Sequence, residues 1–117
     1  MAGVMLDLNE TPKPKVGKIN FARINSAALK VLPSLLNRWL PGGRVEGNEY
    51  VARNPRRADR HLGSFKVNLR TGRWSDFAEA DAAGGDPISL AAYLAGISQI
   101  EAAERVAAML GVEARHG

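Results

Sequence analysis

One alternating stretch near the middle of the chain constrains the fold more than any other part of the sequence. Phe65, Val67 and Leu69 are separated by single polar residues, and this period of two is typical of a strand with one buried face. Arg70-Thr71-Gly72 follows as a short connection whose glycine can adopt a positive φ. Residues 73–77 are then predicted to form the returning strand, so the sequence predicts a β-hairpin.

A second hairpin is predicted over residues 44–53, with Gly47-Asn48 as its turn. Two pairs of residues can supply the buried faces of this hairpin, Tyr50 with Ala52 or Val45 with Val51. Both alternatives fit the period of two.

Helices are predicted before the two hairpins. Asn25 or Ser26 can cap a helix that continues to about Leu32, and Pro33 then breaks it and fits the first turn of a second short helix. Pro41-Gly42-Gly43 ends that second helix. Trp39 lies on its apolar face and is predicted to be a core residue.

Two more helices are predicted after the hairpins. Asp86 is a good N-cap with Pro87 at the first helical position, and Gly96 stops this helix. Ser98 and Glu101 fit a capping box that starts the last helix, and Gly111 ends it.

These elements predict an α+β fold in which a small antiparallel sheet of two hairpins is flanked by helices on both sides in sequence. Residues 1–22, which are rich in lysine and proline, are predicted to be a flexible basic arm. Residues 23–117 are expected to form a single domain. The chain contains no cysteine, which excludes disulfides and thiolate zinc sites, and no apolar run is long enough to cross a bilayer. We therefore expect a cytoplasmic protein with no membrane partner.

The formal charge of +4 is distributed unevenly along the chain. Residues 1–43 hold six Lys or Arg and two Asp or Glu, residues 44–73 hold eight and three, and residues 74–117 hold two and seven. The first two segments can face a polyanion, whereas the acidic last segment cannot.

The order of these features resembles the N-terminal zinc-binding domain of bacterial, phage and plasmid DNA primases. That family shows Cys-Pro-x-His, then Pro-Ser-Phe-x-Val, then aromatic-x-Cys-Phe-x-Cys, then Gly-Gly-Asp and a helix. The corresponding segments here are Asn54-Pro55-Arg56-Arg57, Gly63-Ser64-Phe65-Lys66-Val67, Trp74-Ser75-Asp76-Phe77-Ala78-Glu79 and Gly84-Gly85-Asp86-Pro87. The resemblance covers roughly residues 42–113.

All four metal-ligand positions of that family are substituted. On this alignment they hold Asn54, Arg57, Asp76 and Glu79, so the resemblance implies a zinc-ribbon-like domain without metal and without a cofactor. Our hypothesis is that an arginine of the 53–60 loop, Arg57 on this alignment, pairs with Asp76 or Glu79 and replaces the zinc with a charge-assisted cross-link.

The resemblance further implies a non-catalytic module that engages single-stranded DNA beside a primase or helicase. No catalytic constellation or phosphate-binding loop is recognisable, so we do not expect an enzyme. A basic loop and the central hairpin would contact phosphates, and Trp74 or Phe65 could stack on a base unless both fill the core. The predicted nucleic-acid-binding residues are Arg53, Arg56, Arg57, Arg60, His61, Lys66, Arg70, Arg73 and Trp74. The alternative function is a protein-interaction adaptor derived from such a module, with the acidic helical third as its docking face.

Overall fold

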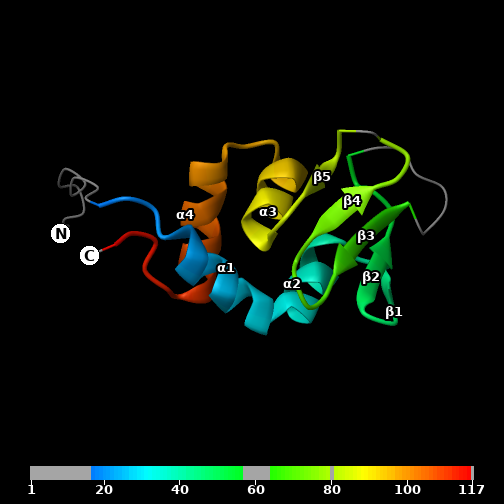
Figure 1. Ribbon diagram of the computed structural model, residues 1–117, viewed down its shortest axis with the longest axis horizontal. Helices are drawn as coiled ribbons and strands as arrows, with labels where there is room; N and C mark the ends of the chain where they lie inside the picture. Colours follow the sequence, from blue (N-terminus) through cyan, green and yellow to red (C-terminus); the bar gives the residue numbers. More distant parts are fainter. Residues whose placement is uncertain (1–16, 57–63, 80, 117) are drawn as a thin grey trace, which may run out of the picture.

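The computed structural model describes residues 17–56, 64–79 and 81–116. Helices α1 and α4 lie together at one end of the molecule, the sheet lies at the other end, and α3 lies between them (Figure 1). The elements are, in chain order, α1 (Phe21–Lys30), α2 (Leu32–Trp39), β1 (Arg44–Glu46), β2 (Glu49–Ala52), β3 (Phe65–Asn68), β4 (Trp74–Asp76), β5 (Ala83–Gly84), α3 (Pro87–Ala95) and α4 (Gln99–Leu110). The predicted α+β class is confirmed.

The strands form one open antiparallel sheet in the order β1-β2-β3-β4-β5. Tyr50 pairs with Val67, and Val67 pairs in turn with Trp74. Trp74 then pairs with Gly84 of β5, a two-residue strand that the sequence analysis did not predict. This strand was missed because it is too short to show alternation and contains a glycine.

The structure decides between the two alternatives for the buried face of the hairpin at 44–53. Tyr50 and Ala52 are buried against the helices, which is the first alternative. Val51 on the opposite face is buried as well, whereas Val45 is 59% exposed. The turn at Gly47-Asn48 lies between the two strands as predicted, and Gly47 has a φ of 63°.

The predicted ends of α3 and α4 are confirmed. Asp86 caps α3 by accepting a hydrogen bond from the Ser89 amide at 2.8 Å, and Ser98 caps α4 in the same way through the Glu101 amide at 3.1 Å. The capping box predicted for α4 is not completed, because the Glu101 side chain pairs with Arg105 at 2.6 Å. Gly96 and Gly111 end these helices in the left-handed conformation. Pro33 lies in the first turn of α2, also as predicted.

The predicted start of the first helix is wrong. The helix begins at Phe21, because Asn20 accepts a hydrogen bond from the Arg23 amide at 3.0 Å and acts as its N-cap. Asn25, which the sequence analysis offered as the cap, lies inside α1. Its side chain accepts a hydrogen bond from the Ile88 amide at 3.0 Å and so joins α1 to α3.

Part of the segment predicted to be a flexible arm belongs to the folded structure. Ile19 is buried and forms an antiparallel bridge with Arg115, and Arg115 donates a hydrogen bond to the Gly17 carbonyl at 2.9 Å. Arg115 also pairs with Glu104 at 2.6 Å, so one side chain ties the start of the described chain to its end and to α4. Residues 1–16 lie outside the described residues.

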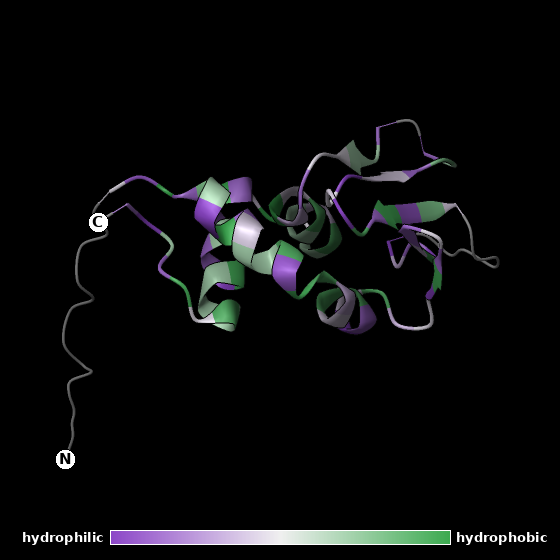
Figure 2. Ribbon diagram, turned by 60° about the horizontal axis from the view of Figure 1, so that its bottom comes forward, coloured by the Kyte–Doolittle hydropathy of each residue, from purple (hydrophilic) through white to green (hydrophobic). Residues whose placement is uncertain are grey.

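Two clusters of buried side chains form the core, and α3 contributes to both. One lies between α1, α3 and α4, and the other lies between α2, α3 and the inner face of the sheet. The largely hydrophobic α3 appears mostly green between its neighbours in Figure 2. Trp39, predicted to be core, packs against both clusters while remaining half-buried. Among the described residues, the helices are too short or too polar to cross a bilayer.

Candidate nucleic-acid interface

The sheet has a polar face on the side opposite the helices, which we call the outer face. Because side chains alternate along a strand, Lys66 of β3 and Ser75 of β4 point to this side, together with Val51 of β2, which is itself buried. Lys66 pairs with Ser75, and Ser75 pairs with Ala83, which gives one cross-strand row of the outer face. Asn68 and Arg73 lie in a second row, where the Asn68 amide donates to the Arg73 carbonyl at 2.7 Å.

The outer face is hollowed into an open depression of about 580 Å³. The residues that line it include Glu49, Lys66, Asn68, Arg73, Ser75 and Gly85. The lining mixes polar and apolar surface and carries two cations and one carboxylate.

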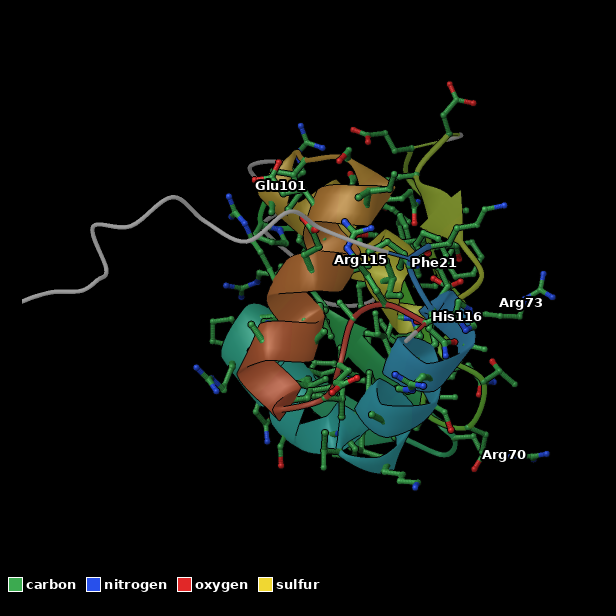
Figure 3. All side chains as sticks on the ribbon, turned by 90° about the vertical axis from the view of Figure 1, so that its left-hand side faces the viewer. Phe21, Arg70, Arg73, Glu101, Arg115 and His116 are labelled. Atoms are coloured by element: carbon green, nitrogen blue, oxygen red, sulfur yellow. The ribbon has the colours of Figure 1, made fainter. Side chains whose placement is uncertain are left out.

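The cations on this side of the molecule differ in how they are paired. Lys66 lies 3.9 Å from a Glu49 carboxylate oxygen, a distance that gives only weak neutralisation. Arg70 and Arg73 are exposed, and their side chains point away from the molecule on the same side (Figure 3). Within the described part of the chain, neither of these arginines has a carboxylate partner. The predicted residues Lys66, Arg70 and Arg73 therefore share one side of the sheet.

Trp74 is not an exposed stacking platform, which corrects the sequence analysis. It is only 5% exposed, and its indole nitrogen donates a hydrogen bond to Ser89 Oγ at 2.9 Å. Its ring lies 5.7 Å from the Phe65 ring and 4.9 Å from the Tyr93 ring, measured between centroids. Phe65 is fully buried in the same cluster. Both aromatics belong to the core because their positions face the helices.

The exposed aromatic of the hairpin is Phe77, which the sequence analysis did not select. It directly follows β4, is 71% exposed, and has Lys66 Nζ at 5.5 Å from its ring centroid. Its amide donates to the Ser64 carbonyl at 2.8 Å, which continues the pairing of β3 with β4 by one position. Alternation from the buried Trp74 and Asp76 was the signal that could have placed it on the outer face.

The arginines predicted to form a basic loop do not all join this face. Arg53 is exposed beyond the end of β2. Arg56 instead lies against α3, where it donates to the Tyr93 carbonyl at 2.9 Å and stacks over the Tyr93 ring at 5.0 Å from the centroid. Arg57, Arg60 and His61 lie outside the described residues.

A hydrogen-bonded network, here called the polar cross-link, joins Asn54, Asp76, Glu79 and Tyr93. The Asn54 amide nitrogen donates to Asp76 Oδ2 at 2.8 Å and to the Tyr93 hydroxyl at 2.8 Å. The Tyr93 hydroxyl donates to Glu79 Oε1 at 3.1 Å. Asn54 and Asp76 are 1% and 3% exposed, so these bonds satisfy polar groups that water does not reach.

The polar cross-link also fixes two turns of the backbone. Asn54 Oδ1 accepts from the Arg56 amide at 2.8 Å, and Asp76 Oδ1 accepts from the Ala78 amide at 2.9 Å. Each is the side-chain-to-backbone bond of an Asx turn. The network therefore joins the turn after β2 to the turn after β4 and anchors both to α3.

The ion pair expected at these positions stays a prediction. Asp76 and Glu79 lie in the polar cross-link, whereas the proposed cation Arg57 lies outside the described residues. In the described ranges, no three carboxylate or imidazole side chains come close enough to hold a metal ion.

A second hollow lies on the helical side of the molecule. It is an apolar groove of about 270 Å³ between α3 and α4, lined by residues that include Trp39, Leu94, Ile97, Arg105, Val106 and Met109.

Sequence comparison adds no further assignment, because no family model and no curated protein matches the chain.

Proposed function

We propose that this protein is a non-catalytic module that binds single-stranded DNA through the outer face of its sheet and the turn between β3 and β4. The observation that carries the proposal is that Lys66 and Arg73 line one open depression, while Arg70 points to the same side of the molecule as Arg73. Cations on a surface bind the phosphates of a strand and release its counterions, so binding of this kind weakens with salt.

The proposal predicts a modest dependence on salt. If the three cations each neutralise one phosphate, the slope of log K against log salt for a single strand is about −2. Affinity would then fall about 20-fold between 50 mM and 200 mM salt. A titration with a fluorescently labelled single strand measures both quantities, and absence of binding at 50 mM salt would refute the proposal.

A charge-reversal pair tests whether the outer face is the binding surface. Arg73→Glu is expected to weaken binding. It should also reduce the magnitude of the slope of log K against log salt by more than about 0.7, the contribution of one phosphate contact. Arg38→Glu makes the same charge change on an exposed position of α2, a helix that packs against the inner face of the sheet. This control is expected to leave the slope unchanged, and equal losses in the two variants would point to net charge rather than to a site.

We further propose that the domain is a metal-free relative of the primase zinc ribbon, and that the polar cross-link takes the place of the metal. The support is that three of the four positions aligned with zinc ligands, Asn54, Asp76 and Glu79, meet in one network with Tyr93. By this likeness, the natural context would be the replication system of a phage, plasmid or integrated element, beside a primase or helicase. Stoichiometric zinc in the purified protein would refute the metal-free assignment.

The second candidate is the protein-interaction adaptor, and the apolar groove between α3 and α4 favours it. Leu94, Met109 and Trp39 contribute to its mainly apolar lining, which also includes the cation Arg105. An apolar segment of a partner protein with an acidic flank would fit this lining. Met109→Lys would abolish such binding while leaving binding to single-stranded DNA unchanged, whereas Arg73→Glu would have the opposite effect.

A further inference from the structure

The exposed ring of Phe77 is held in a defined place. Its amide bonds to Ser64, and the next amide, of Ala78, bonds to the buried carboxylate of Asp76. The backbone on both sides of the ring is therefore fixed by the sheet and by an Asx turn. A ring that is 71% exposed on such a fixed backbone can receive a planar ligand without an ordering step in the main chain.

The surroundings of the ring favour a ligand with both a flat apolar part and an anionic part. The ammonium group of Lys66 lies over the ring, so a base would stack on the ring's other side or displace this cation. Ser75 of β4 and the flanking Arg73 precede Phe77 on the same face of the sheet. The path from Arg73 to Phe77 along an extended strand is about 13 Å, which leaves room for a short stretch of a nucleic-acid strand. A phosphate can reach Lys66 or Arg73 while a base covers the ring.

We propose that Phe77 is the base-stacking residue of this protein and that it selects unpaired strands. The inference rests on the proposed function, which supplies the strand, and it adds the part of the strand that is recognised. Stacking needs a base whose flat side is free, and in a duplex the flat sides are covered by neighbouring base pairs. Every base has such a side, so the contact gives little sequence preference.

The experiment compares Phe77→Ala with Phe21→Ala, a matched control in which the other exposed phenylalanine, 39% exposed on α1, is removed. Binding is measured by fluorescence anisotropy with a labelled 12-nucleotide single strand, with the same strand made fully abasic, and with a duplex. Phe77→Ala is expected to lose about 5- to 150-fold in affinity for the normal strand, the range for one lost stacking contact. Phe21→Ala is expected to match the wild type.

Three further results are expected if Phe77 stacks on a base. Phe77→Ala keeps the wild-type salt slope, because it removes no phosphate contact. Phe77→Tyr restores binding, because a phenol ring also stacks. The wild type binds the abasic strand about as weakly as Phe77→Ala binds the normal strand, and Phe77→Ala does not distinguish the two strands.

The failure of this inference is distinguishable from failure of the proposed function. If Phe77→Ala binds the single strand as tightly as the wild type while Arg73→Glu binds it more weakly, the stacking role is overturned and the proposed function stands. Absence of binding by the wild type would overturn both. An unchanged melting temperature of Phe77→Ala, expected for an exposed side chain, shows that any lost affinity is a property of the site.

Discussion

The polar cross-link predicts that removal of the Tyr93 hydroxyl destabilises the fold. Tyr93→Phe removes one oxygen and leaves the ring against Phe65 and Trp74. The lost oxygen accepts from Asn54 and donates to Glu79. The Glu79 side of the bond is exposed, so water can replace it, and this part of the loss is small.

The cost arises from Asn54, which is 1% exposed. One of its two amide hydrogens loses its acceptor, and a buried donor left without a partner costs about 1–3 kcal/mol. We expect the variant to be less stable by about 1–2 kcal/mol, because the other hydrogen keeps its bond to Asp76. For a domain of this size, such a loss lowers the melting temperature by about 5–15 °C.

Thermal and urea unfolding followed by circular dichroism measure this loss, and a double-mutant cycle assigns it. In an Asn54→Ala background the Tyr93 hydroxyl no longer accepts a hydrogen bond from the Asn54 amide. Tyr93→Phe should therefore lower the free energy of unfolding less there than in the wild type. The expected coupling is at least about 0.5 kcal/mol. A wild-type melting temperature for Tyr93→Phe, or strictly additive losses in the cycle, would refute the view that the network stabilises the ends of β2 and β4.

Three further predictions concern stability. An excess of a zinc chelator is expected to leave the melting temperature unchanged, and a drop would show that a metal contributes to the fold. Gly84→Ala would force a methyl group into the indole of Trp74 and should cost about 1–3 kcal/mol, whereas Gly85→Ala, with open space around the added carbon, should cost far less; equal costs would contradict the packing argument. Asp86→Ala should cost about 1 kcal/mol through loss of the α3 cap, while Asp81→Ala, an exposed carboxylate outside any helix, should be neutral; the difference in denaturation midpoints is the measurement.

The ends of α3 and α4 could be predicted from the sequence because the interactions that set them are local. Asp86 and Ser98 each bond to an amide three residues away, and Gly96 and Gly111 each supply a left-handed conformation at one position. None of these depends on a distant part of the chain.

Long-range contacts explain what the sequence analysis missed. The start of α1 was misplaced because Asn25 has the chemistry of a cap but bonds to Ile88, 63 residues away. The polar cross-link was foreseen only in part, since the positions of Asn54, Asp76 and Glu79 were grouped by the resemblance. Tyr93 was not included, because nothing within α3 indicates that its hydroxyl reaches the ends of β2 and β4.

Pairing across the sheet explains why Trp74 is buried and Phe77 is exposed. Directly paired residues point to the same face, so Val67 places Trp74 inside, and the next pair on that face, two positions along, places Asp76 beside Phe65. Phe77 is then outside whatever its hydrophobicity. A shift of one residue in this register would bury Phe77 and expose Trp74, and it would also move the Asp76 carboxylate away from Asn54. The polar cross-link thus fixes the register that presents Phe77, although Phe77 itself contributes little to the core. Substitutions in the polar cross-link should therefore lower both stability and DNA binding, whereas substitutions at Phe77 should lower DNA binding alone.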